Sequence, residues 1–287
     1  MNNIEFITPP FNYTGSKLKV LNEIIPLFDY SKNNFFDVFV GGGSVYSNIL
    51  DKYDTIYIND IIKELVEIHR SILESDDIIN NTKELCKLIV DKNSYVKMRT
   101  EFNTYKTPEK LLSLMMTCTN NMMRFNKKFE FNQTYGERNW NKKTDIKMER
   151  FKTEIRKYKA KIKFHSLHFE AFKNIITDST MIYCDPPYGR IKKENGSLDT
   201  KQISEAGYNV YWNYDDDLKL YEFLKFIDKN RQSFMLSGTL NHNGNVSWIM
   251  DKLINEKYNY KEINCNYEKV SRLETNKNTT EIIIFNY

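Results

Sequence analysis

The run Asp185-Pro186-Pro187-Tyr188 combines side chains and backbone groups that could hold a planar amine. It directly follows residues 180–184, a short apolar run typical of a buried strand. The two prolines force an extended backbone and lack N–H donors, so nearby carbonyls can point into a cleft. Asp185 adds a carboxylate acceptor, and Tyr188 adds a flat aromatic face. This combination suits an exocyclic amino group on a planar base, although a Pro-Pro loop with a capping Asp would have the same sequence.

A glycine turn is the second candidate site. The apolar run 35–40 ends at Gly41-Gly42-Gly43, where backbone can approach a ligand closely and a following helix would offer free N–H groups. The pattern is not G-x-G-x-x-G, so a dinucleotide is not favoured. Asp60 closes the next strand-like run, where a carboxylate can accept hydrogen bonds from ribose hydroxyls. A purely structural tight turn is the alternative.

Residues 124–163 carry most of the positive charge. They hold 14 Lys and Arg against 5 Asp and Glu, a net charge of +9, so the rest of the chain carries −5 within the total of +4. A basic segment interleaved with aromatic residues is typical of a nucleic-acid-binding surface. A solvated, Lys-rich helix face is the alternative, because residues 145–163 have helical spacing. The aromatic residues are Phe125, Phe129, Phe131, Tyr135, Trp140 and Phe151.

Both candidate sites require a parallel sheet whose strands end at one edge. A strand at 35–40, a glycine turn, helical spacing at 44–50 and a strand at 55–59 predict a doubly wound α/β domain. A helix is predicted at 61–73. Residues 80–163 then become helical, basic and aromatic, with a turn-rich patch at 132–141, so an insertion interrupts the sheet. Further strands are predicted at 162–165, 180–184, 233–237 and 281–286.

Composition excludes several classes of protein. The chain has 287 residues, 40% of them hydrophobic, with 10 Gly and 6 Pro, so it is not disordered, collagen-like or a disulfide mini-protein. No apolar run is long enough for a membrane span, and residues 1–10 lack the pattern of a secretory signal. The cysteines form no CxxC pair, so we expect no zinc site, no disulfide framework and a reduced, intracellular protein. They are Cys86, Cys118, Cys184 and Cys265.

Short segments extend the pattern, in order, over almost the whole chain. They are Tyr13-Thr14-Gly15-Ser16-Lys17, Phe36-Asp37-Val38-Phe39 with Gly41-Gly42, Ile58-Asn59-Asp60, Asn121-Met122-Met123-Arg124, Ser166-Leu167-His168-Phe169, Asp185-Pro186-Pro187-Tyr188, Leu236-Ser237 and residues 281–286. In these segments the chain resembles the Dam-type DNA N6-adenine methyltransferases, in particular the phage T4-like members. The order of methyl-donor motif, recognition insertion and catalytic motif is that of the family's α class.

The resemblance implies a fold and a set of functional residues. The fold is α/β, a Rossmann-like S-adenosylmethionine-dependent methyltransferase sheet with an inserted, mainly helical target-recognition domain. The catalytic domain would comprise residues 1–75 and 164–287, and the insertion residues 76–163. The catalytic residues would be Asp185, Pro186, Pro187 and Tyr188. Residues binding S-adenosyl-L-methionine, with no metal, would be Tyr13, Lys17, Asp37, Gly41, Gly42, Asp60, His168, Phe169 and Asp185.

The implied chemistry is methyl transfer to the N6 atom of adenine. The amine is a poor nucleophile because its lone pair is delocalised into the ring. Hydrogen bonds from its N–H groups to Asp185 and to the Pro186 carbonyl would localise that pair and aim it at the methyl group. The base must leave the duplex to be reached, and Tyr188 would supply a stacking face for it. S-adenosyl-L-homocysteine is the expected product.

The implied partner is double-stranded DNA, with GATC or a related short site as the target. Arg124 and Arg138 match positions that contact bases, and Arg bidentate to guanine is the commonest specific base contact. The turn departs from the family at Thr134 and Glu137, so a relative of GATC is possible on this basis. The other DNA-contacting candidates are Asn120, Met122, Lys127 and Lys128, while the lysines of 142–163 should touch phosphates or nothing.

Three further points accompany the resemblance. Val40 stands where T4-like members carry Cys, and the loop between Tyr188 and Tyr208 is longer than theirs, which leaves the seating of Tyr208 and Trp212 open. An RNA or protein N-methyltransferase, or a catalytically inactive DNA-binding module, are the alternatives. Localisation would be cytoplasmic, or in the host-cell cytoplasm if the protein is viral, and no membrane contact is expected.

Overall fold

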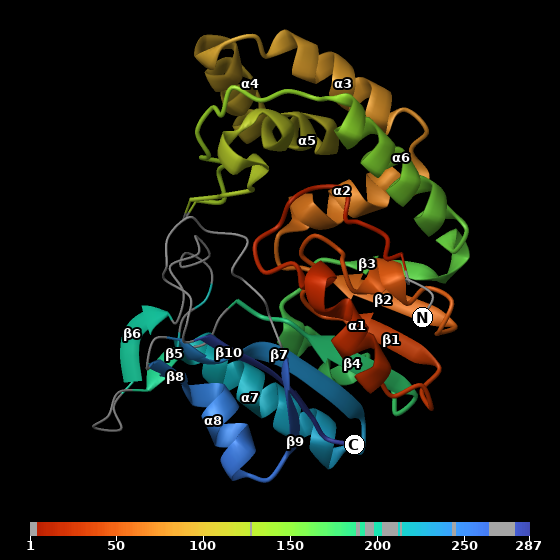
Figure 1. Ribbon diagram of the computed structural model, residues 1–287, viewed down its shortest axis with the longest axis vertical. Helices are drawn as coiled ribbons and strands as arrows, with labels where there is room; N and C mark the ends of the chain where they lie inside the picture. The colour runs from red at the N-terminus through yellow and green to blue at the C-terminus, as the bar shows by residue number, and fades with distance from the viewer. Residues whose placement is uncertain are drawn as a thin grey trace. The chain divides into compact units, whose positions relative to one another are not determined.

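The computed structural model describes residues 5–126, 128–187, 190–192, 198–202, 212, 214–242, 245–263 and 279–287 (Figure 1). For 190–192, 198–202 and 214 it describes the backbone alone. The helices are α1 (Leu21–Ile24), α2 (Lys63–Glu74), α3 (Ile78–Leu88), α4 (Lys92–Thr104), α5 (Pro108–Thr117), α6 (Lys142–Arg156), α7 (Tyr214–Lys229) and α8 (Trp248–Asn255). The strands are β1 (Asn34–Asp37), β2 (Thr55–Asn59), β3 (Ile162–His165), β4 (Thr180–Cys184), β5 (Arg190–Lys192), β6 (Leu198–Gln202), β7 (Ser233–His242), β8 (Asn245–Ser247), β9 (Asn259–Ile263) and β10 (Thr279–Phe285).

The described strands form one mixed sheet in the order β3-β2-β1-β4-β7-β8-β5-β6. β1 and β7 both pair parallel with β4, whereas β10 pairs antiparallel with β7 and with β9. All five residues of β4 are buried, as expected for a central parallel strand covered on both faces. The α/β fold class predicted from the sequence is therefore confirmed.

The predicted strands match the observed ones closely, but one predicted helix is wrong. Residues 44–50 contain only a 3₁₀ turn at Tyr46–Asn48. Gly43 has a φ of +81°, and the side chains of Ser47 and Asn48 bond to the backbone oxygens of Gly43 and Ser44, respectively. Such local side-chain bonds compete with a regular helix. β9, which has four exposed residues out of five, was not predicted.

The chain divides into two compact units. Unit 2 comprises Lys19–Phe39, Lys52–Tyr57 and Leu167–Tyr287. Its core joins alternate residues of β1, β4, β7 and β10 to the apolar faces of α7 and α8, which lie beside these strands in Figure 1. Side chains at the intervening positions cover the other face, where Phe35 and Tyr183 pack against Phe28.

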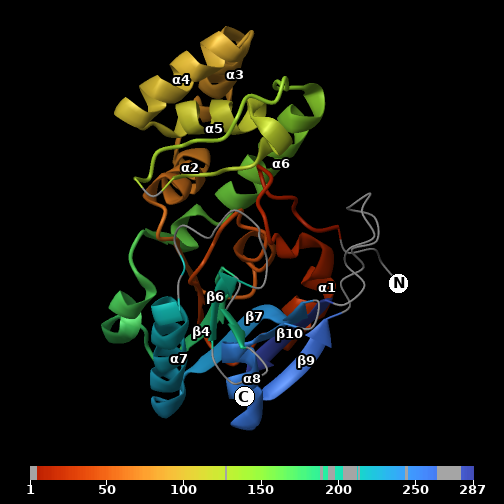
Figure 2. The same cartoon turned by 90° about the vertical axis from the view of Figure 1, so that its left-hand side faces the viewer.

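Unit 1 comprises Met1–Leu18, Val40–Asp51 and Ile58–Ser166. Its helices surround α5, in which seven consecutive residues, from Leu111 to Thr117, are buried. A helix buried on all sides needs neighbours on all sides, and α2, α3 and α4 each pack against α5 (Figures 1 and 2). The helical character predicted for residues 80–163 is thereby confirmed.

Two further features concern the cysteines and the length of the helices. Cys86, Cys118 and Cys184 are free and buried, and burial raises the pKa of the thiols of Cys86 and Cys118 to about 12. Cys265 lies outside the described residues. Among the residues that the structure describes, no helix is long and apolar enough to cross a membrane.

Candidate functional site

In unit 2, Asp185 lies at the carboxyl end of β4 and is half-buried. The Ser237 hydroxyl, fully buried in β7, donates to Asp185 Oδ1 at 2.7 Å. The Tyr183 hydroxyl lies 3.0 Å from Ser237 Oγ. Because Ser237 gives its proton to the carboxylate, Tyr183 must be the donor in this second bond. A relay from Tyr183 through Ser237 thus fixes one oxygen of Asp185.

The two prolines after Asp185 are half-buried, and Tyr188 lies outside the described residues. Lys193, Glu194 and Tyr208 of the longer loop lie outside them as well. The predicted stacking face of Tyr188 therefore stays a prediction.

An aromatic cluster in unit 2 contains one of the predicted donor-binding residues. Phe169 lies 5.8 Å from Phe39 and 6.0 Å from Trp212, measured between ring centroids. The Trp212 indole N–H donates to the buried carboxylate of Asp217 at 2.7 Å. The His168 ring lies 4.3 Å from that of Phe169 and is more exposed. This places Trp212, whose seating the sequence left open, in the core beside Phe169.

In unit 1, Tyr13 packs directly on the glycine turn. A Cβ atom at Gly41 would lie 2.7 Å from Tyr13 Cε1, and one at Gly42 would lie 2.8 Å from Tyr13 Cβ. Gly41 also has a φ of +49°, which favours glycine. Both glycines are thus needed for the close approach of Tyr13, and the structure brings these three predicted residues together.

Asp60 is bound to the same turn. Its Oδ2 accepts from Gly41 N at 3.2 Å and its Oδ1 from Ile62 N at 3.0 Å. Burial raises the pKa of this carboxyl to about 6, although both backbone N–H groups act to lower it. Asp60 therefore holds the turn in place as well as offering a carboxylate there.

His69 supports the turn from the other side and was not predicted. Its Nε2 lies 2.9 Å from the Gly41 carbonyl, which can only accept, so Nε2 carries the proton and Nδ1 accepts from the Tyr46 hydroxyl at 3.1 Å. Burial lowers the pKa of His69 to about 4, so the ring is neutral near pH 7. The sequence offered no signal, because both partners lie more than 20 residues away.

The two remaining predicted donor-binding residues are charged and buried. In unit 1, Lys17 is 6% exposed and its ammonium donates to the Gly15 carbonyl at 3.0 Å. In unit 2, Asp37 is 2% exposed at the end of β1. The pKa of the Cys184 thiol is raised, mainly by its own burial and in addition by the negative charge of Asp37.

Of the two arginines predicted to contact bases, Arg124 lies on a β-bridged hairpin of unit 1 and Arg138 follows it. Bridges pair Cys118 with Tyr135 and Phe125 with Phe131. Arg124 donates from Nε to Asn132 Oδ1 at 3.0 Å and from Nη2 to the Asn132 carbonyl at 3.2 Å. The hairpin thus orients the exposed guanidinium of Arg124 from its opposite arm.

Arg138 follows the hairpin and is also exposed. Its Nη1 donates to Asn121 Oδ1 at 2.9 Å, and Asn121 in turn donates to the carbonyls of Met115 and Met116 at the end of α5. Of the other DNA-contacting candidates, Asn120 and Lys128 are exposed, Met122 is half-buried and Lys127 lies outside the described residues.

Lys152 does not fit the expectation that the lysines of 142–163 touch phosphates or nothing, and Arg156 of the same helix has a similar structural role. Lys152 is 8% exposed and donates to the Asp76 carbonyl at 2.7 Å. Arg156 donates to the carbonyls of Leu73 and Ser75 and to the Asp76 carboxylate. Both therefore cap the C-terminal end of α2, as cations near unpaired helix carbonyls do.

Comparisons of the sequence with known proteins identify the family of this chain. Residues 13–275 match the model of the D12 class N6 adenine-specific DNA methyltransferases. The chain is similar to the modification methylase StsI of Streptococcus sanguinis, with 26% identity over 99% of this chain and 43% of the relative. It is similar to the type II methyltransferase M.MjaIII of Methanocaldococcus jannaschii, with 27% identity over 82% of this chain and 85% of the relative.

A DNA adenine methylase of Haemophilus influenzae is 27% identical over 65% of each chain. The chain spans less than half the length of StsI. The family model, by contrast, covers most of this chain. Methyltransferases of this family use S-adenosylmethionine. By the extent of that match, the chain belongs to the D12 class N6 adenine-specific DNA methyltransferases.

Proposed function

We propose that the chain transfers a methyl group from S-adenosyl-L-methionine to N6 of adenine in double-stranded DNA. The observation that carries this proposal is the Asp185 carboxylate at the end of β4, held by the relay from Tyr183 through Ser237 and followed by two prolines. It agrees with the matched family, and StsI and M.MjaIII are named as a modification methylase and a methyltransferase.

The reaction asks two things of Asp185 and its neighbours. Asp185 and the Pro186 carbonyl accept the two N6–H groups, which localises the nitrogen lone pair and orients it. The fixed Oδ1 of Asp185 cannot swing away when the amine arrives, since Ser237 is buried in a strand. Tyr188 stacks on the adenine, which must be flipped out of the duplex.

The donor-binding residues fit the chemistry of S-adenosyl-L-methionine. When bound, this group supplies an activated methyl on a sulfonium, so the protein needs only to orient it. Asp60 accepts hydrogen bonds from the ribose hydroxyls of the donor, and Lys17 pairs with the carboxylate of its methionine part. The negative charges of Asp37 and Asp185 favour the positive charges of the donor. The backbone at Gly41 and Gly42 approaches closely with Tyr13, and His168 and Phe169 pack on the adenine of the donor.

The finer assignments rest on the resemblance to the phage T4-like, α class of Dam-type enzymes. We assign residues 1–75 and 164–287 to catalysis and 76–163 to target recognition. The target is GATC or a related short site, with Arg124 and Arg138 contacting bases. Asn120, Met122, Lys127 and Lys128 are the further DNA-contacting candidates. A DNA substrate implies action in the cytoplasm of the cell or host.

Transfer of a labelled methyl group to unmethylated duplex DNA tests the proposal against its alternatives. We expect incorporation into DNA and not into RNA or protein, and Asp185→Ala should abolish it while DNA binding persists. Asp178→Ala, at an exposed aspartate before β4, is the matched control and should retain activity. Near-normal turnover by Asp185→Ala, or label in RNA or protein alone, would reject the proposal.

A further inference from the structure

A cavity of about 340 Å³ lies in unit 1, between the end of the hairpin and the first turns of α6. Its lining includes two cations, Arg138 and Lys147, and polar groups of Asn121, Asn141 and Thr144, and no Asp or Glu of the described part of the chain lines it. The cavity is therefore positively charged and rich in hydrogen-bond donors. None of the donor-binding residues proposed above lines it.

Lys147 has no acceptor for its ammonium among the residues that the structure describes. The residues three and four positions away on α6 are Lys143, Thr144, Arg150 and Phe151, so no carboxylate can reach it along the helix. It is half-buried, and this burial lowers the pKa of its amine. Burial removes part of the hydration of the Lys147 ammonium, and a bound anion would compensate for that loss.

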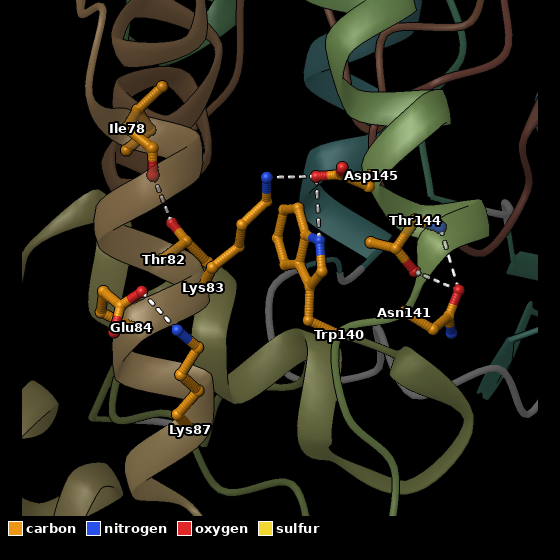
Figure 3. Close-up of polar contacts among 9 residues, drawn as sticks. All are labelled: Ile78, Thr82, Lys83, Glu84, Lys87, Trp140, Asn141, Thr144 and Asp145. Atoms are coloured by element: carbon orange, nitrogen blue, oxygen red, sulfur yellow. Dashed lines mark hydrogen bonds and ion pairs between the residues drawn. The ribbon is translucent and has the colours of Figure 1, made fainter.

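Asp145 and Glu149 are the acidic residues closest to Lys147 in sequence, each two positions away on α6, and Asp145 is already paired. Asp145 pairs with Lys83 of α3 and accepts the Trp140 indole N–H at 3.3 Å, as Figure 3 shows. The Lys83 ammonium also lies 5.8 Å from the centroid of the Trp140 ring. The Asp145 carboxylate is thus bonded to Lys83 and Trp140, not to Lys147.

Arg138 already has a fixed orientation in the cavity. Its Nη1 is bonded to Asn121, which leaves the guanidinium at the rim with Lys147 as its neighbouring cation. The Lys147 ammonium, with amide and hydroxyl groups around it, suits the oxygens of a phosphodiester.

We propose that this cavity binds one backbone phosphate of the DNA, with Lys147 as its principal cation. The inference rests on the proposed function, because that function supplies the DNA. A phosphate contact carries no sequence information, so Lys147 positions the duplex while Arg138, beside it, reads a base.

The salt dependence of DNA binding tests this assignment. Removing one contact between a cation and a phosphate should flatten the slope of log affinity against log salt concentration by about 0.9. The loss caused by Lys147→Met should therefore shrink about 3.5-fold between 50 and 200 mM salt. It should be equal on target and non-target duplexes, and Lys147→Arg should restore the slope. Lys157→Met is the matched control, because this exposed lysine directly after α6 pairs with Glu154.

A duplex with single neutral methylphosphonates tests the same contact in the wild-type protein, even if Lys147→Met folds poorly. With the wild type, a methylphosphonate at one position of the duplex should flatten the salt slope as Lys147→Met does. The same methylphosphonate should not flatten the slope of Lys147→Met any further. An unchanged slope in both experiments would overturn the proposal, as would a loss confined to the target sequence. Methylation by the wild type, measured in parallel, distinguishes this failure from a failure of the proposed function.

Discussion

At the scale of single residues, two carboxylates are held in contrasting ways. Asp185 Oδ1 receives a hydroxyl proton from Ser237, whereas both oxygens of Asp60 receive backbone N–H groups. A hydroxyl relay orients a carboxylate without fixing the backbone around it. Two backbone bonds do the reverse, because Asp60 fastens Gly41 and Ile62 to each other. The first arrangement suits a residue that must meet a substrate, and the second one that shapes a turn.

The relay predicts a positioning role for Ser237. Losing a hydrogen bond to a charged group costs about 1.5–3 kcal/mol, so Ser237→Ala should lower kcat about tenfold to hundredfold with little change in DNA affinity. Single-turnover methylation measures this. The matched control is Ser233→Ala on the same strand, which loses a hydroxyl bond to Asp29 at 2.6 Å. If both variants had the same kcat, Ser237 would have no role beyond stability.

The raised pKa of Asp60 predicts how stability depends on pH. The folded-state pKa of about 6 lies above the ordinary aspartate pKa of 3.8, so the folded protein binds this proton more tightly than the unfolded chain. The contribution of Asp60 to the free energy of unfolding therefore falls as pH rises from about 4 to about 6, by roughly 3 kcal/mol.

Denaturant unfolding of the wild type and of Asp60→Asn across that pH range isolates this contribution, because other carboxyls cancel in the difference. We expect the wild type to lose stability relative to Asp60→Asn as pH rises. A difference that stays constant with pH would contradict the raised pKa.

At the scale of elements, glycines decide how closely segments approach. The hairpin passes so near the end of α5 that a Cβ atom at Gly136 would lie 2.4 Å from the backbone carbon of Cys118. Gly136 N also donates to the Thr117 carbonyl at 2.9 Å. The position of Arg138, two residues later, therefore depends on glycine at 136.

Gly136→Ala should thus destabilise unit 1 by about 2–3 kcal/mol, because backbone atoms cannot move aside as a side chain can. Gly15→Ala is an informative comparison, since Gly15 has a φ of +78° with nothing within 4 Å of an added Cβ. Backbone strain alone should cost it only about 1–2 kcal/mol. Thermal unfolding of both variants measures the difference, and equal losses would show that crowding at Gly136 is relieved.

The same elements show what a sequence can predict. β1, β2 and β4 were predicted because their apolar runs reflect burial that the local pattern records. The helix expected at 44–50 is absent because local side-chain bonds compete with it, and Asn48 is also bonded to Ile7, a partner outside any local window. Asp60 and the glycine turn were found by motif, and Ser237 lies in the matched Leu236-Ser237 segment, although its bond to Asp185 could not be predicted from it. His69 lies in no matched segment and acts through tertiary contacts alone.

At the scale of the whole molecule, the basic segment serves two purposes. Part of its charge maintains the fold, since Lys152 and Arg156 cap α2. Another part is exposed on the hairpin, where Arg124 and Lys128 lie. Counting charges along the chain could not separate these roles, because capping depends on where the end of α2 meets α6.

Target choice is the property that depends on these exposed cations together. Expression in a strain without its own adenine methylation, followed by mapping of methylated adenines, should show modification at GATC or a closely related site. Arg124→Ala should cost about 1–3 kcal/mol at that site and relax the preference, because a bidentate contact to guanine is lost.

Lys128→Ala is the matched control for Arg124→Ala, because it removes an exposed cation from the same hairpin. A phosphate contact there would weaken binding to all sequences alike, so the mapped sites should become fewer without changing in sequence. Arg124 is already oriented by Asn132, so its effect should depend on the base it faces rather than on its charge alone. Wild-type modification outside any GATC-like context would reject that target, and an unchanged preference in Arg124→Ala would reject its role as a base reader.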